Sequence, residues 1–349
     1  FTFTRNSEAT FVNAQGLIKS TNELGAEEIT NGDFSNGSTG WNIINNTGTS
    51  SEITNDYAVI KTDGAYTQID QPSVTIAAKT YKLQYTILES DGGNLGFIIT
   101  GNQTASIPNT VGTHIYYFVA NSTSIVFKRA SGALDVKFDN VSVKEYITET
   151  NTPRLDYSTG AEAFLLEPQR TNLITYSEDF SDVSWGKVNA TITSNYSTSI
   201  FGTNTSFLLT STSAIAAKIN KAISSSNNTQ TYFVKKANHN FVQILDFGSV
   251  EMYANFDLNN GVVGSFGSSS TAYIKELSNG WYKISCYFTG TTSRTNLYIS
   301  ESNTSVYGGG NIPIGATIEI SAAQVEQGSY PTSYIPTTTT TVTRNQELC

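Results

Sequence analysis

The clearest structural signal in the chain is Tyr81-Lys82-Leu83-Gln84-Tyr85-Thr86-Ile87, where apolar or aromatic residues alternate with polar ones. A period of two places the odd-numbered side chains on one face of a β-strand and the even-numbered side chains on the other. Such a strand buries one face in a core and leaves the second face near water. The stretch therefore predicts a half-buried strand of an antiparallel sheet.

The same two-residue period returns elsewhere, at residues 136–143 with one slip, at 241–245 and at 284–288. Turn dipeptides such as Asn31-Gly32, Asp63-Gly64 and Asn260-Gly261 separate these runs. The chain has 19 Tyr and 18 Phe but 1 Met, a composition that suits pleated surfaces better than helices. We therefore expect an all-β protein built from antiparallel β-sandwiches.

Length and charge indicate the number of domains and exclude some kinds of partner. The chain has 349 residues, of which 14% are charged, and a formal net charge of -9. At about 100–200 residues per domain, this length predicts two domains. The 20 Lys and Arg residues are spread thinly and form no basic stretch, so we expect no nucleic acid partner. No apolar run approaches the roughly 20 residues that span a bilayer, so we expect no membrane insertion.

A short motif occurs twice, about one domain apart. The letters D-F-S followed by Trp are found at residues 33–35 with Trp41, and again at residues 179–181 with Trp185. Two copies are too few for a solenoid, so we expect tandem domains. The predicted division is an N-terminal connector at 1–26, a sandwich at 27–147, a linker at 148–169, a second sandwich at 170–328 and an extended C-terminal connector at 329–349.

The first predicted sandwich resembles the jelly-roll carbohydrate-binding modules of families four, nine and twenty-two. The resemblance is carried by N-G-D-F-S at residues 31–35, by Trp41, and by the closing F-D-N-V-S-V at residues 138–143. The second sandwich looks similarly lectin-like. The expected fold is therefore all-β, with two tandem antiparallel jelly-roll β-sandwiches and extended connectors.

The same resemblance implies a structural Ca²⁺ that ties the opening loop to the closing strand through oxygen ligands. Asp33 and Asp139 stand at the positions of these ligands, whereas Ser35 stands where the modules usually have a Glu. The alternative is that Asp139 hydrogen-bonds the opening loop without a metal. In the second sandwich the candidate ligands are Asp179 and Glu326.

The rest of the chain resembles the outer domains of phage tail fibres and head fibres. The matching motifs include P-R-L-D-Y at residues 153–157, L-L-E-P-Q-R-T-N-L at 165–173 and S-Y-I-P-T at 333–337. This resemblance implies a virion-surface protein with other virion proteins as partners. It also implies a homo-oligomer, with a trimer favoured, and a chain that is part of a longer fibre.

Polysaccharide binding needs exposed aromatic rings and nearby amides or carboxylates. The candidates are tyrosines in polar, turn-rich surroundings: Tyr57 and Tyr66 in the first sandwich, Tyr253 and Tyr307 in the second. The three tryptophans are expected to lie in the cores instead.

The sequence contains no catalytic motif that we can identify. Neither His114 nor His239 lies in a metal-binding spacing, and no G-x-S-x-G motif is present. Cys286 lies in an apolar run and is expected to be buried, whereas Cys349 ends the chain and is expected to be a free thiol at a frayed end; the alternative is a disulfide between the two. We therefore predict that the protein is not an enzyme; a converging pair of carboxylates for glycoside hydrolysis is the enzymatic alternative.

The expected function is adhesion: a non-enzymatic fibre or decoration protein on the virion surface that binds host or environmental polysaccharide. One alternative is the accessory carbohydrate-binding portion of a secreted bacterial polysaccharide-degrading enzyme. Another is a purely structural capsid or tail decoration without a ligand.

The connectors carry arginines that are expected to form ion pairs, because the guanidinium fork matches a carboxylate. These arginines are Arg5, Arg154, Arg170 and Arg344, with Glu8, Asp156 and Glu167 as the expected partners.

Overall fold

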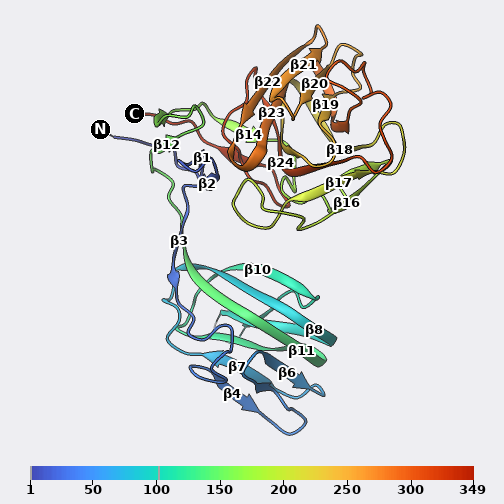
Figure 1. Cartoon of the computed structure of the whole chain (residues 1–349). Coiled ribbons are helices and arrows are strands. Elements are labelled where there is room, and N and C mark those ends of the chain that lie inside the picture. Colours follow the sequence, from blue (N-terminus) through green and yellow to red (C-terminus); the bar gives the residue numbers. More distant parts are fainter. Residues whose placement is uncertain (1, 101–102) are drawn as a thin grey trace. The chain divides into compact units, whose positions relative to one another are not determined.

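The computed structural model describes residues 2–100 and 103–349 and shows an all-β protein (Figure 1). Its large antiparallel sheets curl into sandwich-like shapes, which confirms the predicted fold class. Within the described residues the helical structure is limited to a 3₁₀ turn at Ser278–Gly280. No helix in this part of the chain is long and apolar enough to cross a membrane.

The chain divides into two compact units. Asn22–Thr148 forms the inserted unit, and the chain up to Thr21 together with Glu149–Cys349 forms the main unit. The first sandwich is thus an insertion into the unit that contains the second sandwich, because the N-terminal segment folds with the C-terminal half of the chain.

The described residues of the inserted unit form one nine-stranded sheet that folds over its own core. Its main path runs in the order β10-β8-β11-β6-β5, with the remaining strands paired to β8, β11 and β7. The strands are β3 (Glu23–Glu27), β4 (Asn42–Asn45), β5 (Glu52–Ile53), β6 (Ala58–Thr62), β7 (Thr67–Gln71), β8 (Thr80–Thr100), β9 (Gln103–Ser106), β10 (Gly112–Val119) and β11 (Ile125–Ile147).

The two-residue period of β8 is confirmed. Tyr81, Leu83, Tyr85 and Ile87 are all buried in one core, each contributing about 1.5–3 kcal/mol through burial of apolar surface. The slip in the period of β11 has a structural cause. Asn140 adopts a left-handed backbone with φ 53°, and the register with β8 shifts between Asp139 and Ser142. This β-bulge returns the later residues of β11 to the core face.

The sandwich of the main unit is a ten-stranded antiparallel sheet in the described residues. Its path is β16-β17-β24-β18-β23-β19-β20-β21, with β15 beside β18 and β22 beside β23. The strands are β15 (Gly186–Val188), β16 (Ala190–Thr193), β17 (Phe207–Ser211), β18 (Lys218–Lys236), β19 (Phe241–Leu245), β20 (Tyr253–Asp257), β21 (Val262–Phe266), β22 (Ser270–Glu276), β23 (Trp281–Ile299) and β24 (Thr317–Gln327).

The segments expected as separate connectors fold together within the main unit, which differs from the predicted division. They form three two-stranded sheets, β1-β2, β12-β13 and β14-β25. The last of these pairs the start of the second half of the chain with its end. The strands are β1 (Thr10–Val12), β2 (Ile18–Ser20), β12 (Arg154–Asp156), β13 (Ala163–Leu165), β14 (Arg170–Asn172) and β25 (Val342–Arg344).

A buried arginine–glutamate network joins these connectors. Arg5 and Arg154 both bond Glu347, at 3.0 Å and 2.7 Å, and Arg154 and Arg344 each lie 3.0 Å from Glu167. The three arginine side chains and Glu347 are fully buried. Glu167 was an expected partner, whereas Glu347, which joins the two ends of the chain, was missed.

The other two expected partners bind neutral donors. Asp156 accepts the Val12 backbone N–H at 2.8 Å, and Glu8 accepts the Ser20 hydroxyl at 3.0 Å. Arg170 pairs with Glu326 at 3.5 Å. The connectors are therefore held by a mixture of ion pairs and carboxylate-to-backbone bonds that sequence alone does not distinguish.

Both cysteines lie as expected. Cys286 is buried in the core of the main unit, and Cys349 is exposed; both thiols are free. Burial raises the pKa of the Cys286 thiol, since the thiolate is not stabilised by water in the core.

The first prediction concerns the buried network. Replacing Glu347 with Gln is expected to lower the free energy of unfolding of the main unit by about 3–5 kcal/mol, because two buried guanidinium groups lose their shared counter-charge. Chemical denaturation followed by tryptophan fluorescence measures this loss. The control is Glu162→Gln, which removes an exposed carboxylate bonded to Tyr157. Equal stability losses in the two variants would contradict the assignment.

The second prediction concerns thiol reactivity. An aromatic disulfide reagent is expected to modify Cys349 rapidly in the folded protein and to reach Cys286 only after denaturation. Absorbance of the released thiolate counts the modified residues. Rapid modification of both thiols in the folded state would show that the core around Cys286 opens readily.

Candidate functional site

The repeated D-F-S motif forms the same local structure in both units. Asp33 accepts bonds from the backbone N–H and the hydroxyl of Ser35, and Asp179 does the same with Ser181. In each loop the Phe ring packs against the following Trp, with centroids 5.3 Å and 4.9 Å apart. The motif therefore forms an opening turn that is anchored in the core by the contact between its Phe and the following Trp.

Each opening loop is tied to its closing strand by a backbone bond. Val141 N–H donates to Gly32 O at 2.8 Å in the inserted unit, and Ala323 N–H donates to Ser177 O at 2.9 Å in the main unit. The carboxylate of Asp139 instead accepts the backbone and side-chain N–H groups of Asn140. The loop and the closing strand thus meet without a direct bond from Asp139.

Asp33 and Asp139 are near enough to interact electrostatically. Burial raises the pKa of Asp139, and the charges of Asp33 and Asp56 add to this rise. In residues 2–100 and 103–349, no group of three or more His, Cys, Asp or Glu side chains is placed to hold a metal ion. A Ca²⁺ here would rely on backbone oxygens, and it stays a prediction.

The candidate ligands of the second sandwich have separate environments. Asp179 lies in the opening loop with Ser181, near Lys187 and Lys221. Glu326 is buried in β24, where Thr332, Gln324 and Arg170 surround its carboxylate. Glu326 thereby serves as an internal ion-pair and hydrogen-bond acceptor, and the two carboxylates share no bonding partner.

The candidate tyrosines of the inserted unit each lie next to a lysine. The Lys137 ammonium sits 3.7 Å from the centroid of the Tyr57 ring, and Lys128 lies 5.3 Å from that of Tyr66. Tyr66 also hydrogen-bonds Gln68. A cation from β11 therefore lies over one face of each ring.

The two candidate tyrosines of the main unit come together. The rings of Tyr253 and Tyr307 meet edge to face with centroids 6.4 Å apart, and Phe247 packs against Tyr307 at 6.2 Å. Phe247 is 49% exposed, while both tyrosines are partly exposed. We call these three residues the aromatic cluster.

A lysine lies beneath this cluster. Lys218 Nζ is 4.2 Å from the centroid of Phe247 and donates to the Tyr298 hydroxyl at 2.7 Å. Burial lowers the pKa of Lys218 to about 8, with a smaller contribution from Arg294. Below that pH the ammonium is charged, and it lies against the face of an exposed aromatic ring.

Strand register explains why these residues share one face. Lys218 on β18 and Gln243 on β19 both lie opposite Tyr298 on β23. Two residues along, the next row carries Asn220, Asn296, Leu245 and Tyr253. Residues two apart point to the same side of a sheet, so Lys218, Asn220, Gln243 and Asn296 share one side, on which all four are buried.

One amide of this face is incompletely satisfied. Asn296 donates to Leu245 O at 3.0 Å, but its buried Oδ1 has no hydrogen-bond partner among the described residues. The sequence analysis identified Tyr253 and Tyr307 but missed Phe247 and Lys218. Their participation depends on which strands are neighbours, and no local pattern in the sequence reports that.

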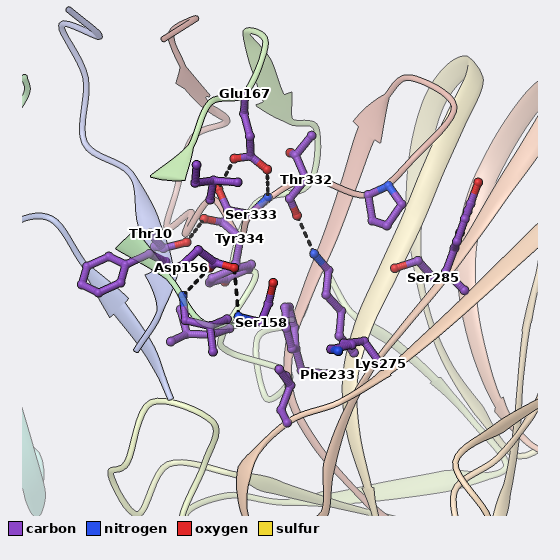
Figure 2. A pocket seen from close by; sticks show the side chains of 18 residues that line it. Thr10, Asp156, Ser158, Glu167, Phe233, Lys275, Ser285, Thr332, Ser333 and Tyr334 are labelled. Carbon is purple, nitrogen blue, oxygen red and sulfur yellow. Dashed lines mark hydrogen bonds between the residues drawn. The ribbon is translucent and has the colours of Figure 1, made fainter. Parts of the chain in front are cut away.

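A separate pocket lies elsewhere in the main unit, with a volume of about 290 Å³ (Figure 2). Its lining comes from β1, from the connectors and from β18, β22 and β23, and includes Asp156, Phe233, Lys275, Lys283 and Tyr334. Figure 2 shows Glu167 at one end, accepting the backbone N–H of Ser333 at 2.8 Å and its hydroxyl at 2.6 Å.

Glu167 is ionised at neutral pH. Burial alone would raise the pKa of Glu167, but Arg344 and Arg154 outweigh burial and hold this pKa below its ordinary value. Its negative charge is thereby committed to the arginine network. Neither Lys275 nor Lys283 forms an ion pair in the described part of the chain, although burial lowers the pKa of Lys283 and the charges of Glu326, Glu167 and Asp156 partly oppose this.

Comparisons with known proteins identify no family. No family model and no curated protein matches the chain. Among solved structures, a Paenibacillus xanthan lyase aligns with 90% of this chain at 11% identity and a TM-score of 0.21, and the chain spans 26% of that enzyme. A vicilin from Corylus avellana aligns with 77% of this chain and 86% of its own at 6% identity and a TM-score of 0.14. Likenesses this weak assign neither a family nor an activity.

The charge state of Glu167 gives the third prediction. Because its folded pKa lies below the ordinary 4.5, ionised Glu167 adds stability that is complete above pH 4.5 and is lost as the pH falls through the folded value. The stability difference between the wild type and Glu167→Gln is therefore expected to shrink on acidification. Urea unfolding at several pH values from 7 to 3 measures it, and a difference that stays constant would contradict the charged assignment.

Proposed function

We propose that this protein is a non-enzymatic adhesion protein that binds polysaccharide through the face of the main unit that carries the aromatic cluster. The observation that supports the proposal is the grouping of Phe247, Tyr253 and Tyr307 beside Lys218. Aromatic rings provide flat apolar surfaces that fit the C–H faces of sugar rings, and a few polar groups fix the orientation of a ligand.

The polar groups around the cluster suit a hydroxylated ligand. Arg294 is exposed on β23, and its guanidinium donates to Asn220 Oδ1 at 2.9 Å, whereas Asn220 and Asn296 themselves are buried. The remaining N–H donors of Arg294 can bind the hydroxyl groups of a sugar. Lys218 and Arg294 would add attraction for sugars that carry acidic groups, within a chain whose formal net charge is -9.

The location that we propose is the virion surface, as part of a tail or head fibre. This part of the proposal is supported by the resemblance of the connector motifs to fibre outer domains. A fibre repeats its subunits, so weak binding at single sites would be strengthened by avidity. A homo-oligomer would therefore serve adhesion directly.

The fourth prediction tests the aromatic cluster. The purified protein, with its oligomeric state checked, is expected to bind at least one member of a broad panel of bacterial and algal polysaccharides. Phe247→Ala is expected to weaken that binding about tenfold or more, because it removes an exposed ring from the binding face. The matched control is Tyr196→Ala, since Tyr196 is also 49% exposed but lies outside the face.

The same assay also tests whether a metal ion is needed for binding and whether the folded protein binds polysaccharide at all. Loss of binding in the presence of a calcium chelator would show that a bound cation stabilises the site, in line with the expected Ca²⁺. Failure of the folded protein to bind any polysaccharide of the panel would overturn the adhesion proposal and favour a structural decoration. Equal weakening by Phe247→Ala and Tyr196→Ala would remove the aromatic cluster from the site.

A further inference from the structure

We propose a second binding site, independent of the aromatic cluster: the pocket of Figure 2 binds the carboxylate of a small hydroxylated acid, such as a uronic acid. The pocket shares no lining residue with the adhesion face, although β18 and β23 contribute different residues to both. The chemistry is set by two lysines that form no direct ion pair in the described part of the chain, by aromatic side chains and by a few hydrogen-bonding groups.

The lysines lie directly opposite each other on neighbouring strands. Lys275 of β22 is the register partner of Lys283 of β23, and both line the pocket. Like charges directly opposite in an antiparallel pair destabilise a sheet. An anion placed between or beside the two ammonium groups removes this repulsion, so the pair is poised for an anionic ligand.

The nearby carboxylates are already committed. Glu167 is bound by Arg154 and Arg344, while Glu326 is bound by Thr332 and Gln324. Asp156 accepts the backbone N–H groups of Val12 and Ser158. Arg5, Arg154, Arg170 and Arg344 balance the charges of Glu167, Glu326, Glu347 and Asp156, so the two lysines are the positive charges of the pocket beyond this balance.

Lys283 retains unused donor capacity. Its ammonium donates to the carbonyl oxygen of Thr332 at 2.6 Å, and an ammonium has three N–H donors. Lys275 is exposed and has no hydrogen-bond partner in the described part of the chain, so the pocket reaches the surface on the β22 side. A carboxylate that enters here would accept charge-assisted hydrogen bonds from both ammonium groups.

The remaining lining sets the size and the polarity of the ligand. Ile18, Phe233 and Tyr334 belong to one buried apolar cluster and line the pocket, and Asp156 and Ser158 add polar groups to the lining. A volume of 290 Å³ equals about ten water molecules of liquid and lies at the small end of ligand pockets. These dimensions suit a single ring that carries hydroxyl groups, an apolar face and one carboxylate.

The test measures binding of D-glucuronate by isothermal titration calorimetry and saturation-transfer NMR, with D-glucose as the neutral control. Glucuronate is expected to bind the wild type at least tenfold more tightly than glucose, and the preference is expected to fall as salt is added. Lys283→Met and Lys275→Met are each expected to weaken glucuronate binding about tenfold. Lys236→Met, which removes one charge elsewhere in the main unit, is the matched control.

Two further comparisons sharpen the outcome. Phe247→Ala is expected to leave glucuronate binding unchanged, which separates this site from the adhesion face. An oligomer of glucuronate that binds more tightly than the monosaccharide would identify the polymer as the source of the carboxylate, and equal affinities would identify the free acid. Equal affinity for glucuronate and glucose overturns the proposal, as does unchanged binding in Lys275→Met, whose exposed side chain makes misfolding an unsuitable explanation.

Discussion

The main unit depends on one buried electrostatic arrangement. Glu347 and Glu167 each bind two of the three buried arginines, Arg5, Arg154 and Arg344. These five residues come from three connector segments that are far apart in the sequence. A buried guanidinium without a counter-charge is strongly unfavourable, so these segments are stable only when they assemble together. The network therefore requires the three connector segments to fold together, and it also holds them in contact once they have folded.

Much of the fold was predictable because alternation is a local property. The two-residue period of residues 81–87 predicts that one face of the strand is buried, whichever strands lie beside it. The slip in the period at residues 136–143 corresponds to a bulge at Asn140. The repeated D-F-S motif predicted tandem domains, and the structure shows the same local turn at both copies. The insertion was not predictable in the same way, because the N-terminal segment finds its partners in residues more than 300 positions away, such as Glu347 with Arg5.

The candidate sites show the same limit. Tyr253 and Tyr307 were identified from their polar surroundings, yet their neighbours Phe247 and Lys218 are brought in by the order of β18, β23 and β19. The opposed pair Lys275 and Lys283 depends on the register of a hairpin around the turn Ser278–Gly280. The residue types in a segment identify candidate site residues. Strand order and register determine which other residues lie next to them.

The place where the chain leaves and re-enters the main unit is itself a closed junction. Thr21 Oγ1 donates to Glu149 O at 3.0 Å, and Arg5 donates to both Thr21 Oγ1 and Glu149 O at 3.2 Å. Residues 22–148 therefore start and finish at neighbouring points held by the same guanidinium. Any domain whose own ends lie close together fits such a junction with little cost in loop entropy. A junction of this kind can therefore hold another domain with closely spaced ends while the main unit keeps its own contacts.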